Sequence, residues 1–254
     1  MTLTMIDADE ALFKLAHLAD ACEQSWSLTA DEVEERVLFF CDASVEAAQN
    51  IARAAKTLAM DDNLLADWWL AMRAADAIGM ALRCDRKSVR LYTQYWEAIV
   101  DRVKSGIHTP YPLYCGFKSL PGGVVRRDEY IAFPAAQSAL FWPPMAKSFA
   151  EFGLDESEGE RVFSGLSASN AIFTLTSGNG RKSWLTTVRR ADINRVELAK
   201  WLAPLADRPG GAAILEAARS NSLVHLAGGT DDVKGAFLTV YFEIDVETLL
   251  SRLS

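Results

Sequence analysis

The fold is decided by two adjacent strand signals, Ala77-Ile-Gly-Met-Ala-Leu-Arg-Cys84 and Ser88-Val-Arg-Leu-Tyr-Thr-Gln-Tyr-Trp96. A charged turn at 85–87 separates them, and β-branched and aromatic residues dominate the second stretch. Helical patterns at 63–74 and 97–104 flank the pair. Together these segments predict one α-β-β-α unit of about 40 residues.

The same order of elements recurs about five times along the 254 residues. Further strand pairs are predicted at 23–28 with 36–41, 111–120 with 124–133, 171–177 with 182–189, and 223–227 with 237–244. Further helices are predicted at 9–22, 45–60, 193–205, 212–220 and 246–253. Three prolines, Pro134, Pro143 and Pro144, predict that the helix after 133 is short. No linker rich in glycine or serine divides the units, so we expect a single domain over residues 1–254.

A unit of about 40 residues cannot bury its apolar faces alone, so neighbouring units must pack into one closed object. Strand pairs in series, flanked by helices, predict an α/β fold: an antiparallel, ten-stranded β-barrel with its helices outside. Functional side chains are then expected inside the barrel. Because side chains alternate along a strand, Arg90, Tyr92 and Gln94 share one face of the strand 88–96.

The composition argues against several classes of protein. The net charge is −8, and a general nucleic-acid binder would need a basic surface for its phosphate contacts. No run of about 18 apolar residues predicts a membrane span, and residues 1–9 lack the pattern of a signal peptide. The four cysteines lack the close spacing of a zinc or redox motif. We therefore expect buried thiols in a reducing cytoplasm and no metal site built from protein side chains.

Three stretches carry a resemblance to a known family: Arg36-Val-Leu-Phe-Phe-Cys-Asp-Ala-Ser44, the pair quoted above, and Val162-Phe-Ser-Gly-Leu-Ser-Ala-Ser-Asn170. With the repeat order, they resemble the ABBA aromatic prenyltransferases, whose barrels (PT barrels) are built from α-β-β-α units. Within that superfamily, the chain looks most like the small peptide prenyltransferases of cyanobactin-type ribosomal peptide (RiPP) pathways. The resemblance covers most of the chain.

The resemblance implies an enzyme that transfers a prenyl group, usually the C5 dimethylallyl group, from its diphosphate to a nucleophilic peptide side chain. The acceptor (Tyr, Trp, His or Arg, in a cyclic or linear peptide) stays open. The leaving diphosphate needs cations and hydroxyl donors, and Mg²⁺ is expected to assist through the diphosphate. An allylic carbocation needs aromatic walls that offer π-faces and exclude water.

The resemblance assigns diphosphate binding to Arg36, Arg90, Tyr92, Lys118, Lys182 and Tyr241. The expected walls for the prenyl group and acceptor are Trp26, Phe117, Tyr130 and Trp184. Glu23 stands about where the family keeps a carboxylate that takes the proton of the nucleophile. Desolvation in a semi-apolar lumen is expected to raise the pKa of Glu23 and suit it to act as a base.

Two alternative functions stay open. One keeps the fold but replaces the peptide with a small aromatic molecule. The other is a non-catalytic binding protein whose barrel is filled with side chains, which Gln94 and Thr239 favour because the family often has cations there. The three histidines lie too far apart in sequence for a zinc site, and His225 is expected in the core. Asp231 and Asp232 are expected in a solvated turn.

Overall fold

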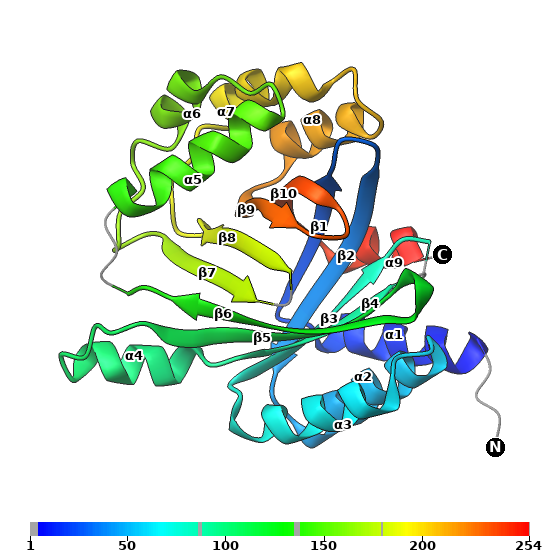
Figure 1. Ribbon diagram of the computed structural model, residues 1–254. Coiled ribbons are helices and arrows are strands. Elements are labelled where there is room, and N and C mark those ends of the chain that lie inside the picture. Colours follow the sequence, from blue (N-terminus) through cyan, green and yellow to red (C-terminus); the bar gives the residue numbers. More distant parts are fainter. Residues whose placement is uncertain (1–4, 86–87, 135–137, 179, 254) are drawn as a thin grey trace.

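The computed structural model describes residues 5–85, 88–134, 138–178 and 180–253. Within these residues, ten antiparallel strands form a closed barrel (Figure 1). The strands are β1 (Ala21–Leu28), β2 (Val33–Asp42), β3 (Ala77–Arg83), β4 (Val89–Gln94), β5 (Tyr111–Leu120), β6 (Val124–Ala132), β7 (Ile172–Gly178), β8 (Arg181–Thr187), β9 (Leu223–Asp231) and β10 (Gly235–Ile244). Each strand pairs with its neighbours in sequence, and β1 pairs with β10 to close the ring. The expected ten-stranded antiparallel barrel is confirmed.

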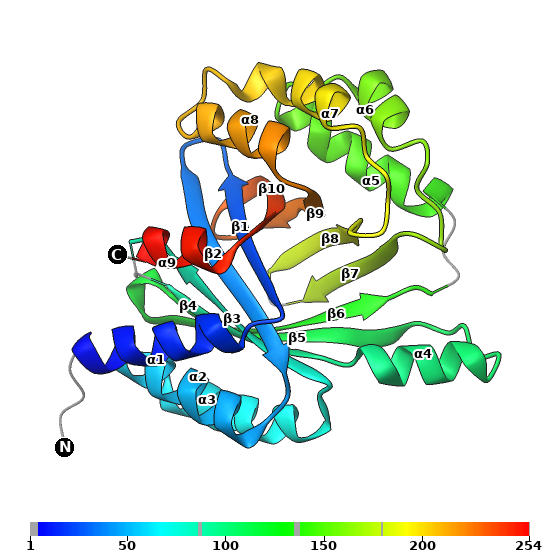
Figure 2. The ribbon, with the colours of Figure 1, turned by 180° about the vertical axis from the view of Figure 1, so that it is seen from behind.

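Helices cover the outside of the barrel, as the repeat pattern predicts. They are α1 (Met5–Leu18), α2 (Val45–Thr57), α3 (Asp62–Ala71), α4 (Trp96–Lys104), α5 (Ser138–Glu151), α6 (Glu156–Val162), α7 (Arg195–Leu202), α8 (Gly211–Ser220) and α9 (Val246–Leu253), with short 3₁₀ turns at Met72–Ala74, Pro121–Gly123 and Ala203–Leu205. Figures 1 and 2 show α5–α8 over one side of the barrel and α1–α3 with α9 over the other. Within the described residues, no helix combines the length and apolar character that a membrane crossing requires.

The helix after β6 is longer than its prolines predicted. The helix α5 runs over 14 residues and holds Pro143 and Pro144 in its interior. A proline inside a helix removes an N–H donor and crowds the preceding turn. Phe141, Met145 and Phe149 are buried on this helix, and their burial offsets the loss. The prediction of a short helix was wrong because tertiary packing outweighs local propensity.

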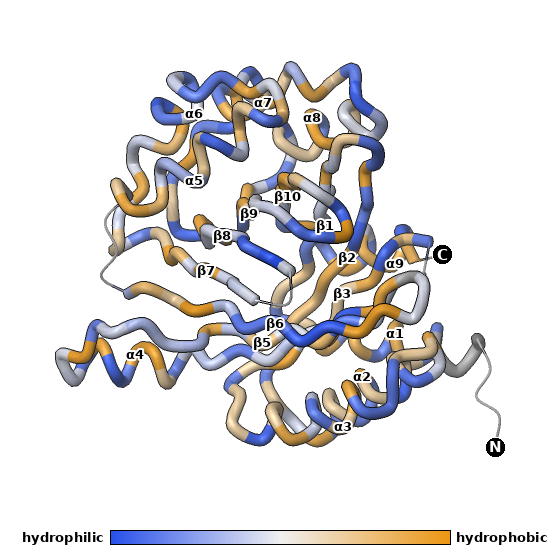
Figure 3. The backbone as a smooth tube through the Cα atoms, in the orientation of Figure 1, coloured by the Kyte–Doolittle hydropathy of each residue, from blue (hydrophilic) through white to orange (hydrophobic). Residues whose placement is uncertain are grey.

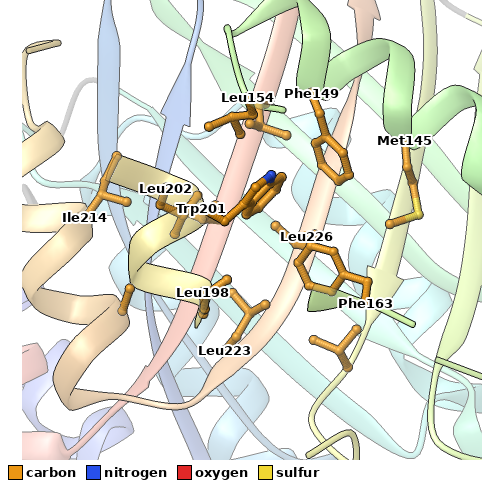
Figure 4. Close-up of a cluster of buried hydrophobic side chains, with 14 of the residues drawn as sticks. Met145, Phe149, Leu154, Phe163, Leu198, Trp201, Leu202, Ile214, Leu223 and Leu226 are labelled. Carbon is orange, nitrogen blue, oxygen red and sulfur yellow. The ribbon is translucent and has the colours of Figure 1, made fainter. Parts of the chain in front are cut away.

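Among the described residues, the hydrophobic core between the barrel wall and the helices has two large clusters, one beneath each group of helices, and a small one beneath α4. In the cluster beneath α5–α8, Phe149 and Phe163 both face Trp201 (Figure 4). Their ring centroids lie 4.8 Å and 5.3 Å from that of Trp201, at nearly perpendicular angles. Edge-to-face aromatic packing of this kind stabilises a core beyond the area it buries. Because these large side chains pack outside the barrel wall, the interior stays open.

The two ends of the barrel differ in what surrounds them. The strands β1, β3, β5, β7 and β9 finish at one end of the barrel, where β2, β4, β6, β8 and β10 begin, and we call it the hairpin end. We call the opposite end of the barrel the helix end. Figure 3 shows a hydrophilic stretch in the middle of β6, after two hydrophobic residues, and another at the start of β8.

The aromatic packing around α5 makes a prediction about stability. Phe149→Ala is expected to lower the free energy of unfolding by about 3–5 kcal/mol, because Phe149 is 0% exposed and its removal leaves a cavity beneath Trp184 and Trp201. Urea denaturation followed by circular dichroism measures the change. Leu140→Ala, on the same helix but 58% exposed, is the matched control and is expected to change stability little. Equal losses in both variants would contradict the assignment of the core.

Candidate active site

The barrel interior is hollow. A cavity of about 490 Å³ occupies the lumen toward the helix end, and a second cavity of about 40 Å³ lies at the hairpin end. Tyr92, Tyr130 and Tyr241 line both cavities, and we call these three side chains the tyrosine layer. The alternative of a barrel filled with side chains therefore does not hold.

The cavity at the hairpin end is cationic. Six basic side chains line it: Arg36, Arg90, Lys118, Arg126, Arg181 and Lys234. Arg36, Arg90 and Lys118 were expected in the lumen, and they are at most 6% exposed. Their proposed role in diphosphate binding stays a prediction. These cations come from different strands, so they converge only because the barrel closes.

A buried carboxylate, Glu34, sits among three of these cations. Its Oε1 accepts a hydrogen bond of 2.8 Å from Arg90 Nη2 and lies 3.6 Å from Arg36 Nε. Lys234 donates to the other carboxylate oxygen. Burial alone would raise the pKa of Glu34, but Arg36, Arg90 and Lys234 together hold it well below its usual range. Glu34 is therefore ionised at neutral pH.

Two further carboxylates pair with the remaining cations. Asp128 accepts a hydrogen bond from Lys118 and lies 3.8 Å from Arg181. Asp231 accepts a hydrogen bond from Arg126. Asp231 thus belongs to the end of β9 and is 7% exposed, so the expectation that it lies in a solvated turn was wrong. Its strand extends further than its glycines predicted.

Positive charge exceeds negative charge at the hairpin end. Glu34, Asp128 and Asp231 balance half of the six cations among the described residues, and the surplus favours an anionic ligand. Burial and the neighbouring charge of Arg181 lower the pKa of Lys118 to about 8. Lys118 therefore carries its charge through the neutral range and loses it in mild base.

The tyrosine layer separates this charged end from an aromatic wall. Phe40 packs against Tyr92 with ring centroids 6.0 Å apart, and Tyr114 meets Tyr130 edge-on at 6.1 Å. Tyr130 was expected as a wall residue and Tyr92 and Tyr241 as diphosphate contacts, and all three face the lumen. Burial raises the pKa of Tyr114 and of Tyr130 to about 12 and raises that of Tyr92. These three phenols therefore stay neutral at physiological pH.

Glu23 lies in the larger cavity, on the opposite side of the tyrosine layer from the cations. Its Oε1 accepts a hydrogen bond of 2.9 Å from Arg189 and lies 3.4 Å from His225 Nε2. The other ring nitrogen of His225 lies 3.0 Å from the Thr187 hydroxyl. Glu23 Oε2 is buried and has no hydrogen-bond partner among the described residues. Glu23 therefore has one oxygen held by two neighbours and one buried oxygen without a hydrogen-bond partner among the described residues.

The pKa of Glu23 differs from the expectation. Burial is the largest influence and raises this pKa, but the interactions with His225 and Arg189 together outweigh burial. The pKa of Glu23 is therefore lower than that of an ordinary glutamate, and the expected rise was wrong. The carboxylate is ionised at neutral pH without help from a ligand.

Three of the four expected wall residues fail because of strand alternation, and two of them lie on β1 and β5. Trp26 and Glu23 lie an odd number of residues apart on β1, so they face opposite sides of the barrel wall. Glu23 faces the lumen, while Trp26 packs outward against Phe242 in the core beneath the helices. Phe117 likewise points away from its neighbour Lys118 and joins the outer core.

The same rule corrects two predictions on β8. Arg181, Leu185 and Thr187 line the lumen, so Lys182 and Trp184 point outward. Lys182 is exposed to solvent, and Trp184 donates a hydrogen bond from Nε1 to the Ser148 hydroxyl of α5. The sequence placed a cation in the lumen from this strand, but the residue is Arg181 and not Lys182.

Sequence reasoning missed several lumen residues, among them Arg126, Arg181, Arg189, Lys234 and His225. Alternation could have found Arg126, because Tyr130 was already expected to face inward and Arg126 lies four residues earlier on the same strand. His225 was expected in the core, but it lines the larger cavity beside Glu23. Lys234 lies in the β9–β10 turn, where no alternation applies. It supplies a cation beside Thr239, where one was expected to be missing.

The donor set gives no support for a metal ion held by the protein. Among the described residues, no three His, Cys, Asp or Glu side chains come together in a way that would hold a metal. Glu34, Asp128 and Asp231 each face lysine or arginine, so their oxygens already have cationic partners. A Mg²⁺ ion that binds through a diphosphate ligand stays a prediction. The three carboxylates do not need such an ion to balance their charge.

The contacts of Glu23 predict how its pKa responds to mutation. Arg189→Gln is expected to raise the pKa of Glu23, because burial is then opposed by His225 but no longer by Arg189. Carbon-13 NMR titration of the glutamate carboxyls measures the shift, and Glu23→Gln identifies the signal. Glu243→Gln is the control, since it removes only the other partner of Arg189. An unchanged pKa in Arg189→Gln would show that this arginine does not control Glu23.

No protein-family model matches the chain, and no curated protein matches its sequence. Solved structures do match its fold. The chain is similar to 5-dimethylallyltryptophan synthase from Streptomyces coelicolor, with a TM-score of 0.59 and 13% identity, over 97% of this chain and 93% of that one. It is also similar to PriB in a binary complex with product diphosphate (TM-score 0.57, 14% identity, 95% and 91% covered). A third match is 6-dimethylallyltryptophan synthase from Micromonospora olivasterospora in complex with DMASPP and Trp. Its TM-score is 0.54 at 13% identity, over 94% of this chain and 96% of that one. The chain therefore has the ABBA-type barrel fold of these prenyltransferases.

Proposed function

We propose that this chain is a prenyltransferase, an enzyme that moves a prenyl group from its diphosphate to an aromatic acceptor. The observation that carries the proposal is the order of side chains along the barrel axis. Cations line the hairpin end, the tyrosine layer follows, and an aromatic-lined cavity with Glu23 completes the lumen. The likeness in fold to dimethylallyltryptophan synthases supports the proposal and favours dimethylallyl diphosphate as the donor.

The donor's diphosphate would bind at the hairpin end, and its prenyl chain would cross the tyrosine layer. In the first step, the bond between the allylic carbon and the diphosphate oxygen breaks, and the oxygen keeps the electron pair. Buried cations such as Arg90 and Lys118 stabilise the charge that develops on the leaving group. The Tyr130 hydroxyl accepts a hydrogen bond of 2.9 Å from Lys118, which leaves its own proton available for a diphosphate oxygen.

The allylic cation would form between the tyrosine rings. Aromatic faces attract a cation within about 6 Å of the ring centroid, and more strongly when water is excluded. Tyr92 and Tyr130 also have raised pKa values, so they present neutral phenols instead of nucleophilic phenolates. The cation is then stabilised by π-faces that do not themselves capture it.

The acceptor would occupy the larger cavity and attack the allylic carbon. A carbon–carbon or carbon–heteroatom bond forms, and the acceptor releases one proton. The Glu23 carboxylate is ionised, and its buried Oε2 has no hydrogen-bond partner among the described residues. We propose that this oxygen takes the proton as a general base. Arg189 and His225 hold the other oxygen and fix the direction of the carboxylate.

We propose an indole-type ring, presented by a tryptophan side chain of a linear or cyclic peptide, as the acceptor. A cavity of about 490 Å³ suits one aromatic ring and a short prenyl chain, so a peptide would insert one side chain and leave its backbone outside. Gln94, Ser169 and Asn170 line the cavity with polar groups that can bond a peptide backbone. Free tryptophan, which the name of one similar synthase suggests, is the alternative.

The test is incubation with dimethylallyl diphosphate and three acceptors: free tryptophan, a linear tryptophan-containing peptide and its cyclic form. Mass spectrometry is expected to show the gain of one C5 unit on the peptides. A gain on free tryptophan alone would favour the small-molecule alternative. Transfer is expected to persist in EDTA, because the cations of the hairpin end already balance the diphosphate. No gain on any acceptor and no diphosphate binding would overturn the proposed function.

Glu23→Gln is expected to reduce turnover by about 10²-fold or more, because the amide cannot accept the acceptor's proton. The affinity for inorganic diphosphate should stay unchanged, since Glu23 lies beyond the tyrosine layer from the cations. Single-turnover kinetics and isothermal titration calorimetry measure the two quantities. Glu243→Gln removes an exposed carboxylate from the same arginine and is the matched control. Normal turnover in Glu23→Gln would remove Glu23 from the mechanism.

A further inference from the structure

We propose that Glu34, Asp128 and Asp231 act as internal counter-ions of the hairpin end. They hold its cations in place while the donor is absent, and the donor's diphosphate displaces them when it binds. This inference rests on the proposed function, because it concerns the site where the diphosphate would lie. A direct consequence is that these carboxylates weaken diphosphate binding.

The first support is the burial of the three carboxylates. Each is at most 7% exposed, and each contacts at least one cation of the hairpin end. Six cations so close together would repel one another without counter-ions, and four of them, Arg36, Arg90, Lys118 and Arg126, are buried. An uncompensated buried charge strongly destabilises a fold. A role in diphosphate binding explains the cations, but the bound diphosphate would neutralise them without help from the carboxylates. The carboxylates are therefore needed to neutralise the cations in the free enzyme.

The second support is the size of the cavity between the cations. It measures about 40 Å³, against about 490 Å³ for the cavity at the helix end. Arg126 and Arg181 line this small space, and both now face a carboxylate. A diphosphate that binds there would draw these two cations away from their carboxylates. The contacts that this movement breaks are the ion pairs with Asp128 and Asp231.

The third support is the position of these ion pairs in the barrel wall. Among the described residues, β6 pairs with β7 at only two positions, Ile131 with Leu175 and Ala132 with Thr174. Toward the hairpin end β6 separates from β7, and β5 and β6 extend further than β7 and β8 (Figure 1). The ion pair of Arg126 with Asp231 joins β6 to β9 across this gap, and that of Asp128 with Arg181 joins β6 to β8. This part of the wall is thus held by side-chain charges that a ligand can exchange.

The inference fixes the direction in which a mutation changes affinity. An amide in place of the Asp128 or Asp231 carboxylate keeps the side-chain volume but removes one negative charge. The free site then loses a counter-ion, while the bound site loses a group that repels the diphosphate. Both effects favour binding, because close charges interact strongly in a buried environment. A residue that only positions the cations for the ligand would give the opposite result.

The experiment is isothermal titration calorimetry with inorganic diphosphate on the full chain. Asp128→Asn and Asp231→Asn are each expected to bind on the order of tenfold more tightly than the wild type. Glu129→Gln is the matched control, because Glu129 is the exposed neighbour of Asp128 on β6, and its removal changes the net charge equally. Its affinity should equal that of the wild type. Unchanged or weaker binding by both Asn variants, or an equal gain in the control, would overturn the inference.

Thermal unfolding gives a second readout that does not depend on turnover. The free Asn variants are expected to melt at a lower temperature than the wild type, and saturating diphosphate should abolish the difference. A deficit that persists at saturation would mean that the carboxylates hold the cations in the bound state too, and would overturn the inference. A wild type that binds no diphosphate would overturn the proposed function itself. A wild type that binds it, with Asn variants that bind no tighter, overturns only this inference.

Discussion

Closure of the barrel between β1 and β10 is the constraint on which the site depends. The register pairs Ser25 with Tyr241 and Ser27 with Thr239, and it fixes which face of both strands points inward. Since side chains alternate with a period of two, a slip by one residue would turn Glu23 outward and bring Trp26 into the lumen. β1 and β10 are each paired on both sides, so neither strand has a free edge at which such a slip could occur. The order of charge, rings and carboxylate along the axis follows from this register.

A second requirement is that a barrel of this size stays hollow while its wall stays rigid. The largest buried side chains pack outside the wall, where α5–α8 and α1–α3 cover them. Small residues make room for rings inside. A Cβ on Gly79 would lie 2.7 Å from the Phe40 ring, and one on Gly116 would lie 3.1 Å from the Tyr92 ring. The lumen therefore keeps a large cavity and an ordered aromatic wall together.

The two ends of the lumen hold charges of opposite sign. At the hairpin end, buried cations outnumber their carboxylates, so the free protein carries a surplus that an anion can neutralise. In the larger cavity, the buried carboxylate of Glu23 is held by Arg189 and His225. The tyrosine layer lies between the two groups of charges and keeps them apart. This separation lets one interior favour the departure of an anion at one end and the capture of a proton at the other.

The sequence by itself determined the architecture, because period-two alternation and helical periodicity are local properties of the chain. It placed ten strands, the outer helices, and the inward face of β4 with Arg90 and Tyr92. From the sequence we also predicted that five more residues face the lumen, and the structure places them there: Arg36, Lys118, Tyr130, Tyr241 and Glu23. Only the tertiary structure decided the register of each strand, and therefore which side chains face the lumen. On β8 the cation in the lumen is Arg181 and not Lys182. The outer core contains three residues that were expected in the lumen: Trp26, Phe117 and Trp184. The tertiary structure also decided which charged side chains pair with one another. Asp231 pairs with Arg126, which lies 105 residues away in the sequence. Contacts between such distant residues produce no periodic pattern from which they could be predicted.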